Sequence, residues 1–231
     1  MSQDVTIETV LDAFIEDQRG RISARTMRNY EDVINLLRHS LDGYAYQLLD
    51  EADTKRFQET LNAGDYQAFC HLFGPERIPE HFGEFLGYFM VKKVLASQDV
   101  LRSAATVTKK LATWLYEQGY VSEEERDLGL DQATAARDLP RAERLSELLY
   151  RQCSKAPVFN LNDIDSEDLI EDLLTIERIE PGALYFTGGI GPLAVSEQAS
   201  ALAKVGWDVY LTLVRVAGTW WVIEVGNVYA M

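Results

Sequence analysis

Apolar side chains recur every three to four positions over the first 155 residues, a period typical of amphipathic helices. The clearest case is 100–118, where six apolar residues share one side and Gly119 ends the pattern. Ser23 is a predicted N-cap for an earlier helix that stops at Gly43. The helices predicted for this part cover 7–15, 23–42, 44–61, 82–94 and 100–118.

The segment 122–156 is predicted to be a helical connector. Ser122 and Glu125 have the spacing of a capping box, in which each side chain accepts a hydrogen bond from the other residue's backbone N–H. Pro140 is tolerated as a first helical residue. The acidic run that follows the connector predicts a short helix over 163–174.

After about residue 176 the pattern changes to short runs of β-branched and aromatic residues, which indicate strands. Ala217-Gly218 separates two such runs and predicts a hairpin, while Ser196 and Gly206 bound a short predicted helix. This part therefore predicts a small, curled antiparallel sheet or barrel. Its strands are expected over 183–187, 192–195, 207–216 and 219–225.

Together these patterns predict an α+β protein, in which an all-α helical bundle precedes a small antiparallel β domain. The chain has 231 residues, enough for one or two domains with buried cores, and its 47% apolar content argues against disorder. The expected organisation is a helical domain over 1–121, the connector over 122–156, and a small acidic α+β or barrel-like domain over 157–231.

The location of the protein is predicted from its cysteines and its hydropathy. Cys70 and Cys153 are too few for a disulfide scaffold, which favours a reducing compartment. The N-terminus lacks the basic and apolar regions of a signal peptide, and no run of 18 uncharged apolar residues occurs. We therefore expect a cytoplasmic protein that does not span a membrane.

The formal charge of −15 disfavours contact with phosphates over most of the surface. The charge is unevenly distributed, because 156–231 holds 11 acidic and 3 basic side chains, whereas 86–116 has Asp99 as its one acidic residue. Two basic groups are therefore the places where a polyanion is expected to bind. The first consists of Arg19, Arg21, Arg25 and Arg28, and the second of Lys92, Lys93, Arg102, Lys109 and Lys110.

Three helical motifs occur in order in the first 121 residues: Thr6-Ile-Glu-Thr-Val-Leu-Asp-Ala-Phe-Ile-Glu, then Ser23-Ala-Arg-Thr-Met-Arg-Asn-Tyr30, then Ser103-Ala-Ala-Thr-Val-Thr-Lys-Lys-Leu-Ala-Thr-Trp-Leu-Tyr-Glu-Gln-Gly-Tyr-Val121. Over roughly residues 4–121 they resemble the N-terminal core-binding (SAM-like) domain of tyrosine recombinases, the phage-integrase family. Residues 44–80 are longer than the usual connection in that family. The resemblance implies a helical domain that clasps DNA, with basic positions matched by Arg25, Arg28, Lys109 and Lys110.

The resemblance does not extend to the chemistry of the family. Recombinases cleave DNA with a nucleophilic Tyr, assisted by Arg, Lys and a His-x-x-Arg motif. None of His39, His71 and His81 begins that motif, and the residues after 120 hold 9 basic against 19 acidic side chains. The chain is therefore not expected to be a recombinase by itself. An enzyme of another kind is the third class of function and is not preferred, because no acid–base or nucleophile constellation stands out, so no cofactor is expected.

Other candidate sites have simpler interpretations. Cys70, His71, His81 and Cys153 match no zinc-ligand spacing, so ordinary buried thiols and surface histidines are preferred to a metal site. A Cys70 nucleophile assisted by a histidine stays open, although adjacent residues on a helix, such as Cys70 and His71, point apart.

Two further motifs fail on their spacing. A calcium loop that starts at Asp163 needs Gly at position 6 and Glu at position 12, where the chain has Asp168 and Leu174. A solvated helix start is therefore the preferred interpretation. Gly188-Gly-Ile-Gly191 lacks the Lys-Ser/Thr of a phosphate-binding loop and is predicted to be a turn.

Aromatic residues of the last third could stack nucleic-acid bases. Only three basic side chains accompany them, so core packing is the preferred interpretation. Trp220 and Trp221 are adjacent on a strand and must face opposite sides, so one of them is expected at an interface with the helical part or a partner protein. The set is Tyr185, Phe186, Trp207, Tyr210, Trp220, Trp221 and Tyr229.

The leading hypothesis is a non-catalytic, DNA-associated or regulatory protein whose helical domain contacts the phosphates of double-stranded DNA, and whose C-terminal domain binds a protein or the helical domain. The alternative is a protein-interaction adaptor that has lost DNA binding, as the charge of −15 and the acidic C-terminal third suggest. The residues expected at phosphates are Arg25, Arg28, Lys92, Lys93, Lys109 and Lys110.

Overall fold

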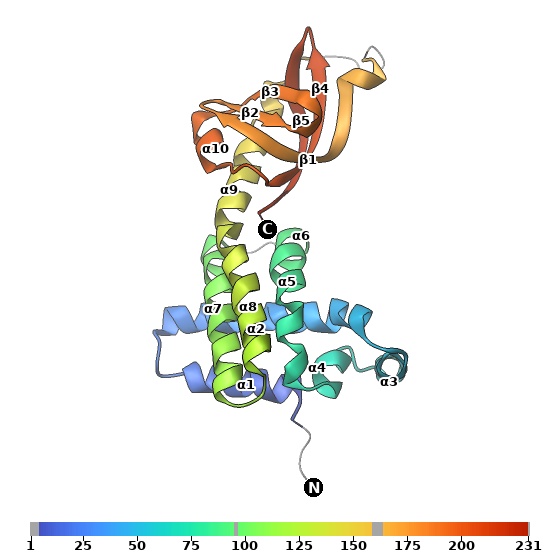
Figure 1. Ribbon diagram of the computed structural model, residues 1–231, viewed down its shortest axis with the longest axis vertical. Coiled ribbons are helices and arrows are strands. Elements are labelled where there is room, and N and C mark those ends of the chain that lie inside the picture. Colours follow the sequence, from blue (N-terminus) through green and yellow to red (C-terminus); the bar gives the residue numbers. More distant parts are fainter. Residues whose placement is uncertain (1–4, 95–96, 159–163, 231) are drawn as a thin grey trace. The chain divides into compact units, whose positions relative to one another are not determined.

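The computed structural model describes residues 5–94, 97–158 and 164–230. They belong to two compact units, 1–137 and 138–231, of which the first is helical and the second is built around a β-barrel (Figure 1). The α+β class predicted from the sequence is confirmed.

Side-chain caps mark the starts of the longer helices of the first unit. These helices are α1 (Ile7–Gln18), α2 (Ala24–Tyr44), α3 (Glu51–Asn62), α4 (Ala68–Leu72), α5 (Phe82–Glu84), α6 (Met90–Lys92), α7 (Gln98–Glu117) and α8 (Glu123–Ala135). Ser23 and Ser97 accept backbone N–H groups at the starts of α2 and α7, and Ser122 forms the predicted capping box with Glu125. Gly119, just past α7, has a φ of 77°, which glycine adopts without strain.

Two helices of the predicted set are wrong in their extent. The helix expected to stop at Gly43 continues, because α2 runs through Gly43 to Tyr44, and the helix expected over 44–61 is interrupted by a 3-10 turn, Ala45–Leu48. Asp50 then accepts the backbone N–H of Asp53 at 2.8 Å and starts α3. An Asp side chain that satisfies a free N–H favours a helix start over a helix interior, which the apolar period does not reveal.

The core of the helical unit fixes α2 against α7 through aromatic packing. Phe14 on α1 is fully buried between Tyr30 on α2, at 6.1 Å between ring centroids, and Trp114 on α7, at 5.6 Å. Aromatic pairs in this range add stability beyond their buried area. The relative placement of α2 and α7 matters for the site described below.

The second unit is a closed five-stranded barrel with the strand order β1-β2-β3-β5-β4. Its elements are α9 (Leu139–Tyr150), β1 (Leu169–Glu180), β2 (Ala183–Phe186), β3 (Ile190–Ala194), α10 (Glu197–Leu202), β4 (Asp208–Val216) and β5 (Thr219–Tyr229). The long β1 pairs with β4 through its first half and with β2 through its second. β3 meets β5 in parallel at Leu193 and Trp220, so the purely antiparallel sheet that we predicted is corrected to a mixed one.

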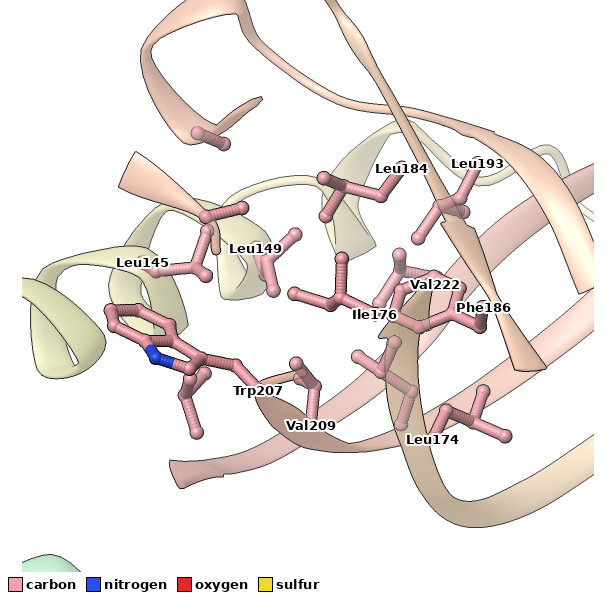
Figure 2. Packing of buried hydrophobic residues seen from close by; sticks show 14 of the residues in the cluster. Leu145, Leu149, Leu174, Ile176, Leu184, Phe186, Leu193, Trp207, Val209 and Val222 are labelled. Atoms are coloured by element: carbon pink, nitrogen blue, oxygen red, sulfur yellow. The ribbon is translucent and has the colours of Figure 1, made fainter. Parts of the chain in front are cut away.

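Helix α9 completes the core of this barrel. Leu149 is fully buried and lies with Trp207 among the apolar side chains inside the barrel (Figure 2). Arg141 donates hydrogen bonds from its guanidinium group to the carbonyl oxygens of residues 201–203, which caps the C-terminal end of α10. The connector expected over 122–156 is therefore divided, with α8 in the helical unit and α9 in the barrel unit.

The acidic segment predicted as a helix over 163–174 is instead a strand from Leu169 onward. Asp163 itself lies outside the described residues. Leu174 and Ile176 alternate into the core, while the preceding acidic positions stay exposed. Pairing with β4 supplies the backbone hydrogen bonds of this half-strand, so a tertiary contact overrides a local helical preference.

The predicted hairpin at Ala217-Gly218 is confirmed, and it yields a stability prediction. Both residues have positive φ, 49° for Ala217 and 79° for Gly218, as a two-residue primed turn requires. Because Asn tolerates this conformation better than Ala, Ala217→Asn should raise the free energy of unfolding of the barrel unit by about 0.5–1 kcal/mol. Urea unfolding followed by tryptophan fluorescence measures it. Ala194→Asn, at an exposed position of β3, is the control and should give no gain in stability. A lower free energy of unfolding in Ala217→Asn would contradict the argument.

Candidate nucleic-acid interface

The first two turns of α2 and α7 are joined by two side-chain hydrogen bonds. Arg25 donates from Nη2 to Oδ2 of Asp99 at 2.6 Å, and Asn29 donates from Nδ2 to Oγ of Ser103 at 3.2 Å. The partners in each pair are 74 positions apart in the sequence. These contacts bring part of the first basic group to part of the second, which the sequence pattern alone does not show.

One exposed side of α7 carries Arg102, Thr106 and Lys110, which we call the α7 face. The three residues are four positions apart, so they lie along one side of the helix over about 12 Å. Arg102 also donates from Nη1 to Oδ1 of Asp99 at 3.3 Å. Lys109 is half-buried beside this face. The α7 face and Arg25 therefore share a single carboxylate, that of Asp99.

Asp99 is held in its charged form by these arginines. The hydrogen bond and the charge of Arg25, followed by the charge of Arg102, lower the pKa of its carboxyl group. The carboxylate thus offsets part of the positive charge of both side chains at neutral pH. It occupies the position between two guanidinium groups that an external anion could also take.

The other arginines of the first group are largely neutralised. Arg19 pairs with Glu16 at 3.0 Å and with Glu31 at 3.3 Å, and Arg21 pairs with Asp17 at 2.7 Å. Arg28 is exposed and forms no ion pair with the residues that the structure describes. Arg28 is therefore the member of this group whose charge no carboxylate of the described residues offsets, and Arg25 is the member that contacts α7, through Asp99.

Lys92 and Lys93 lie near the opposite end of α2 from Arg25. Their ammonium groups lie over the ring of Tyr88, at 5.6 and 5.8 Å from its centroid, and Tyr88 packs edge-on against Tyr44 at 5.9 Å. Arg25 and Tyr44 are separated by about 28 Å of helix at 1.5 Å per residue. The structure thus places these two lysines apart from Arg25, although the charge pattern of the sequence predicts all three at phosphates of the same DNA.

Comparison with known proteins adds no assignment. No family model, no curated protein and no solved structure matches this chain significantly. The likeness to the core-binding domain of tyrosine recombinases therefore stays a prediction that rests on its motif residues. No helix among the described residues is long and apolar enough to cross a membrane.

The two adjacent tryptophans of β5 differ in their surroundings. Trp220 belongs to the barrel core, and the guanidinium group of Arg215 lies 5.3 Å from its ring centroid. Trp221 is half-buried and lines a small cavity together with Gln152 and Lys155. Trp221 is thus the one of the pair with ring surface left for a partner.

The surroundings of Cys70 and His71 do not favour a nucleophilic or metal site. Burial, followed by the charge of Asp42, raises the pKa of the Cys70 thiol, which is therefore protonated at neutral pH and a weak nucleophile. Nδ1 of His71 is 2.8 Å from Oδ2 of Asp65. Within the described ranges, no group of three or more His, Cys, Asp or Glu side chains is arranged to hold a metal ion.

Arg102 is not among the residues predicted to contact DNA, although it belongs to the second basic group. The resemblance to the recombinase domain matches Lys109 and Lys110 and does not match Arg102. The signal that identifies Arg102 is its spacing of four and eight residues from Thr106 and Lys110. Helical spacing thus selects Lys110 over Lys109, which lies beside the α7 face.

Proposed function

We propose that the helical unit binds double-stranded DNA without catalysis, through the α7 face and the first turn of α2, and acts as a DNA-associated or regulatory module. The observation that supports this most is the contact of both Arg25 and Arg102 with Asp99, next to an exposed face that also carries Lys110. Phosphate contacts of this type position a protein on a duplex and give largely sequence-independent affinity.

A DNA phosphate can replace the carboxylate of Asp99 between the two guanidinium groups. Both are oxygen anions that accept charge-assisted hydrogen bonds from arginine. The Arg25–Asp99 pair is exposed, and exposed ion pairs contribute little stability, so opening it costs little. The N-terminus of α7, a 20-residue helix, adds the positive end of its dipole at the same place.

Charge reversal on the α7 face tests the proposal. The double variant Arg102→Glu with Lys110→Glu should bind a 20-base-pair duplex at least about tenfold more weakly at low salt, because two phosphate contacts become repulsive. Fluorescence anisotropy over a salt series measures the affinity, and the slope of log K against log salt should fall by about 2.

The matched control reverses the same charge elsewhere. Arg137 and Arg151 are exposed, form no ion pair with the described residues and are not part of the α7 face, so Arg137→Glu with Arg151→Glu gives the same net charge and leaves that face unchanged. Equal losses in both double variants would reject the α7 face as the site. Absence of duplex binding by the native protein below about 100 μM at low salt would reject DNA binding itself.

Exposed apolar side chains on the segments that flank α3 favour a second candidate, the protein-interaction adaptor. Leu48 precedes α3 and is 61% exposed, and Tyr66 follows it and is 81% exposed, while Tyr46 stacks on Phe57 with 5.5 Å between ring centroids. Exposed apolar side chains of this kind can contact a partner protein. A protein partner whose binding is lost in Leu48→Ser with Tyr66→Ser, and kept when Lys109 and Lys110 are reversed in charge, would support the adaptor.

A further inference from the structure

The barrel unit contains a cavity of about 170 Å³ between the turn that follows α9 and the line where β3 meets β5. Apolar and aromatic side chains make up most of its lining, and two polar side chains enter from the turn. The principal lining residues are Gln152, Lys155, Val195, Trp220, Trp221 and Val222. Pockets for drug-sized ligands are roughly 300–1,000 Å³, so this one fits a single ring system.

Gln152 is the polar group that gives the cavity its chemistry. The residue is only 9% exposed, and its side-chain amide makes no hydrogen bond with the described residues. Its backbone is fixed, because its N–H donates to the carbonyl of Leu149 at 2.8 Å and its carbonyl accepts from Lys155 at 2.9 Å. Its amide atoms are not among the fully buried polar atoms that lack a partner, so they reach solvent at the cavity, where a ligand with a matching edge can bind them.

The other two features of the cavity are an aromatic surface and an exposed ammonium group. Trp221 is half-buried in the lining, and Trp220 is held in place by the barrel core. Lys155 is exposed at the cavity, with no ion pair to any residue that the structure describes. A flat ring can pack against an indole, and an ammonium group at the rim can bind a phosphate.

We infer that this cavity binds a nucleobase that carries a phosphate group, with AMP as the representative ligand. The amide of Gln152 places a donor beside an acceptor, which matches the paired donor and acceptor on the edge of adenine. The base packs against Trp221, and the phosphate lies at Lys155. The inference does not depend on DNA binding by the helical unit, because every residue in it belongs to the barrel unit.

Titration of the full-length protein with AMP, followed by tryptophan fluorescence and calorimetry, tests the site. Gln152→Leu keeps the size of the side chain and removes both hydrogen-bonding groups, so it should weaken AMP binding about tenfold. Gln198→Leu, an exposed position on α10, is the matched control and should bind as the native protein does. Circular dichroism and the melting temperature show whether each variant is folded.

If Gln152→Leu fails to fold, a second variant at Lys155 tests the same site. Lys155 is exposed, so Lys155→Gln should fold; it should weaken AMP binding about tenfold and leave adenosine binding unchanged. Absence of AMP binding at about 10 mM would overturn the inference. Ribose 5-phosphate binding as tightly as AMP would also overturn it, because the base would then contribute nothing.

A short oligo(dA) distinguishes the two sources of such a base. If the site accepts a base within a single strand, the oligonucleotide should bind at least as tightly as AMP and compete with it. If it accepts a free nucleotide, AMP should bind and the oligonucleotide should not displace it. Both results support the nucleobase site and differ only in its natural ligand.

Discussion

Acidification from pH 7.5 to pH 5 should destabilise the helical unit by about 2 kcal/mol through His81 alone, and by about 3 kcal/mol at pH 4. His81 is 3% exposed and packs edge-on against Phe69, with 5.6 Å between ring centroids. Among the described residues neither ring nitrogen has a hydrogen-bond partner, and Nε2 is 3.6 Å from Oε1 of Glu80. Burial, with a smaller contribution from the charge of Arg77, lowers the pKa of His81 to about 4.

The free energy of unfolding changes with pH because the folded and unfolded states take up the His81 proton at different pH values. Above about pH 6.5 the His81 ring is neutral in both the folded and the unfolded chain, so its titration contributes nothing. Between pH 6.5 and about 4 the unfolded chain binds a proton that the folded chain does not, and the free energy of unfolding falls. Below about pH 4 both states are protonated and the loss stops growing.

His81→Leu isolates this effect, because it removes both unpartnered nitrogens and keeps an apolar side chain of similar size. We expect the variant to be at least as stable as the native protein at pH 7.5. At pH 5 its advantage over the native protein should be about 2 kcal/mol larger than it is at pH 7.5. Urea unfolding followed by circular dichroism at both pH values measures it. Glu80, whose pKa is raised by burial, is present in both proteins, so its titration largely cancels from the comparison.

His39 provides the matched control, since it is an exposed histidine of the same unit. His39→Leu should leave the pH dependence of stability unchanged. If native protein and His81→Leu lose the same free energy of unfolding between pH 7.5 and 5, His81 is protonated without cost and its surroundings are more polar than described.

Leu149→Ala should destabilise the barrel unit by about 2–5 kcal/mol, as expected for truncation of a fully buried leucine. The leucine lies on α9, outside the five strands, and its side chain belongs to the core shown in Figure 2. Removing three carbon atoms loses their transfer free energy and leaves a cavity that the closed barrel cannot easily collapse. Urea unfolding followed by the fluorescence of Trp207 and its neighbours measures the loss.

A variant at the adjacent residue of α9 distinguishes the loss of core packing from an effect of alanine on the helix itself. Tyr150 is 68% exposed, so Tyr150→Ala should change the free energy of unfolding by less than about 0.5 kcal/mol. If Leu149→Ala is as mild as Tyr150→Ala, α9 is a connector that only touches the barrel. A large loss from Leu149→Ala alone shows that the smallest folding barrel unit includes α9.

Elements set by neighbouring residues were predictable from the sequence. The capping box of Ser122 and Glu125, the cap at Ser23 and the end of α7 at Gly119 all depend on contacts within one turn of helix. The hairpin at Ala217-Gly218 depends on two backbone conformations. Local chemistry determines these features, so a local pattern reveals them.

Features set by distant residues were not predictable in this way. The first half of β1 is an acidic segment with a helical preference, and it becomes a strand because β4, some 40 residues later, supplies its hydrogen bonds. The apolar side of α9 has the period of any surface helix, and the period does not say which unit buries it. For the same reason the apolar period of 122–156 predicts a single connector and does not show that α8 and α9 belong to different units.

For the candidate sites, too, some features were predictable from the sequence and others were not. The sequence by itself determined the α+β class, the uneven charge and the two basic groups. Only the tertiary structure decided that Arg25 and Arg102 share the carboxylate of Asp99, that Lys92 and Lys93 lie near the other end of α2 from Arg25, and that the amide of Gln152 lines a cavity beside Trp221. The physical reason is range: caps and turns act over a few residues, whereas a site is formed by side chains that packing brings together from distant parts of the chain.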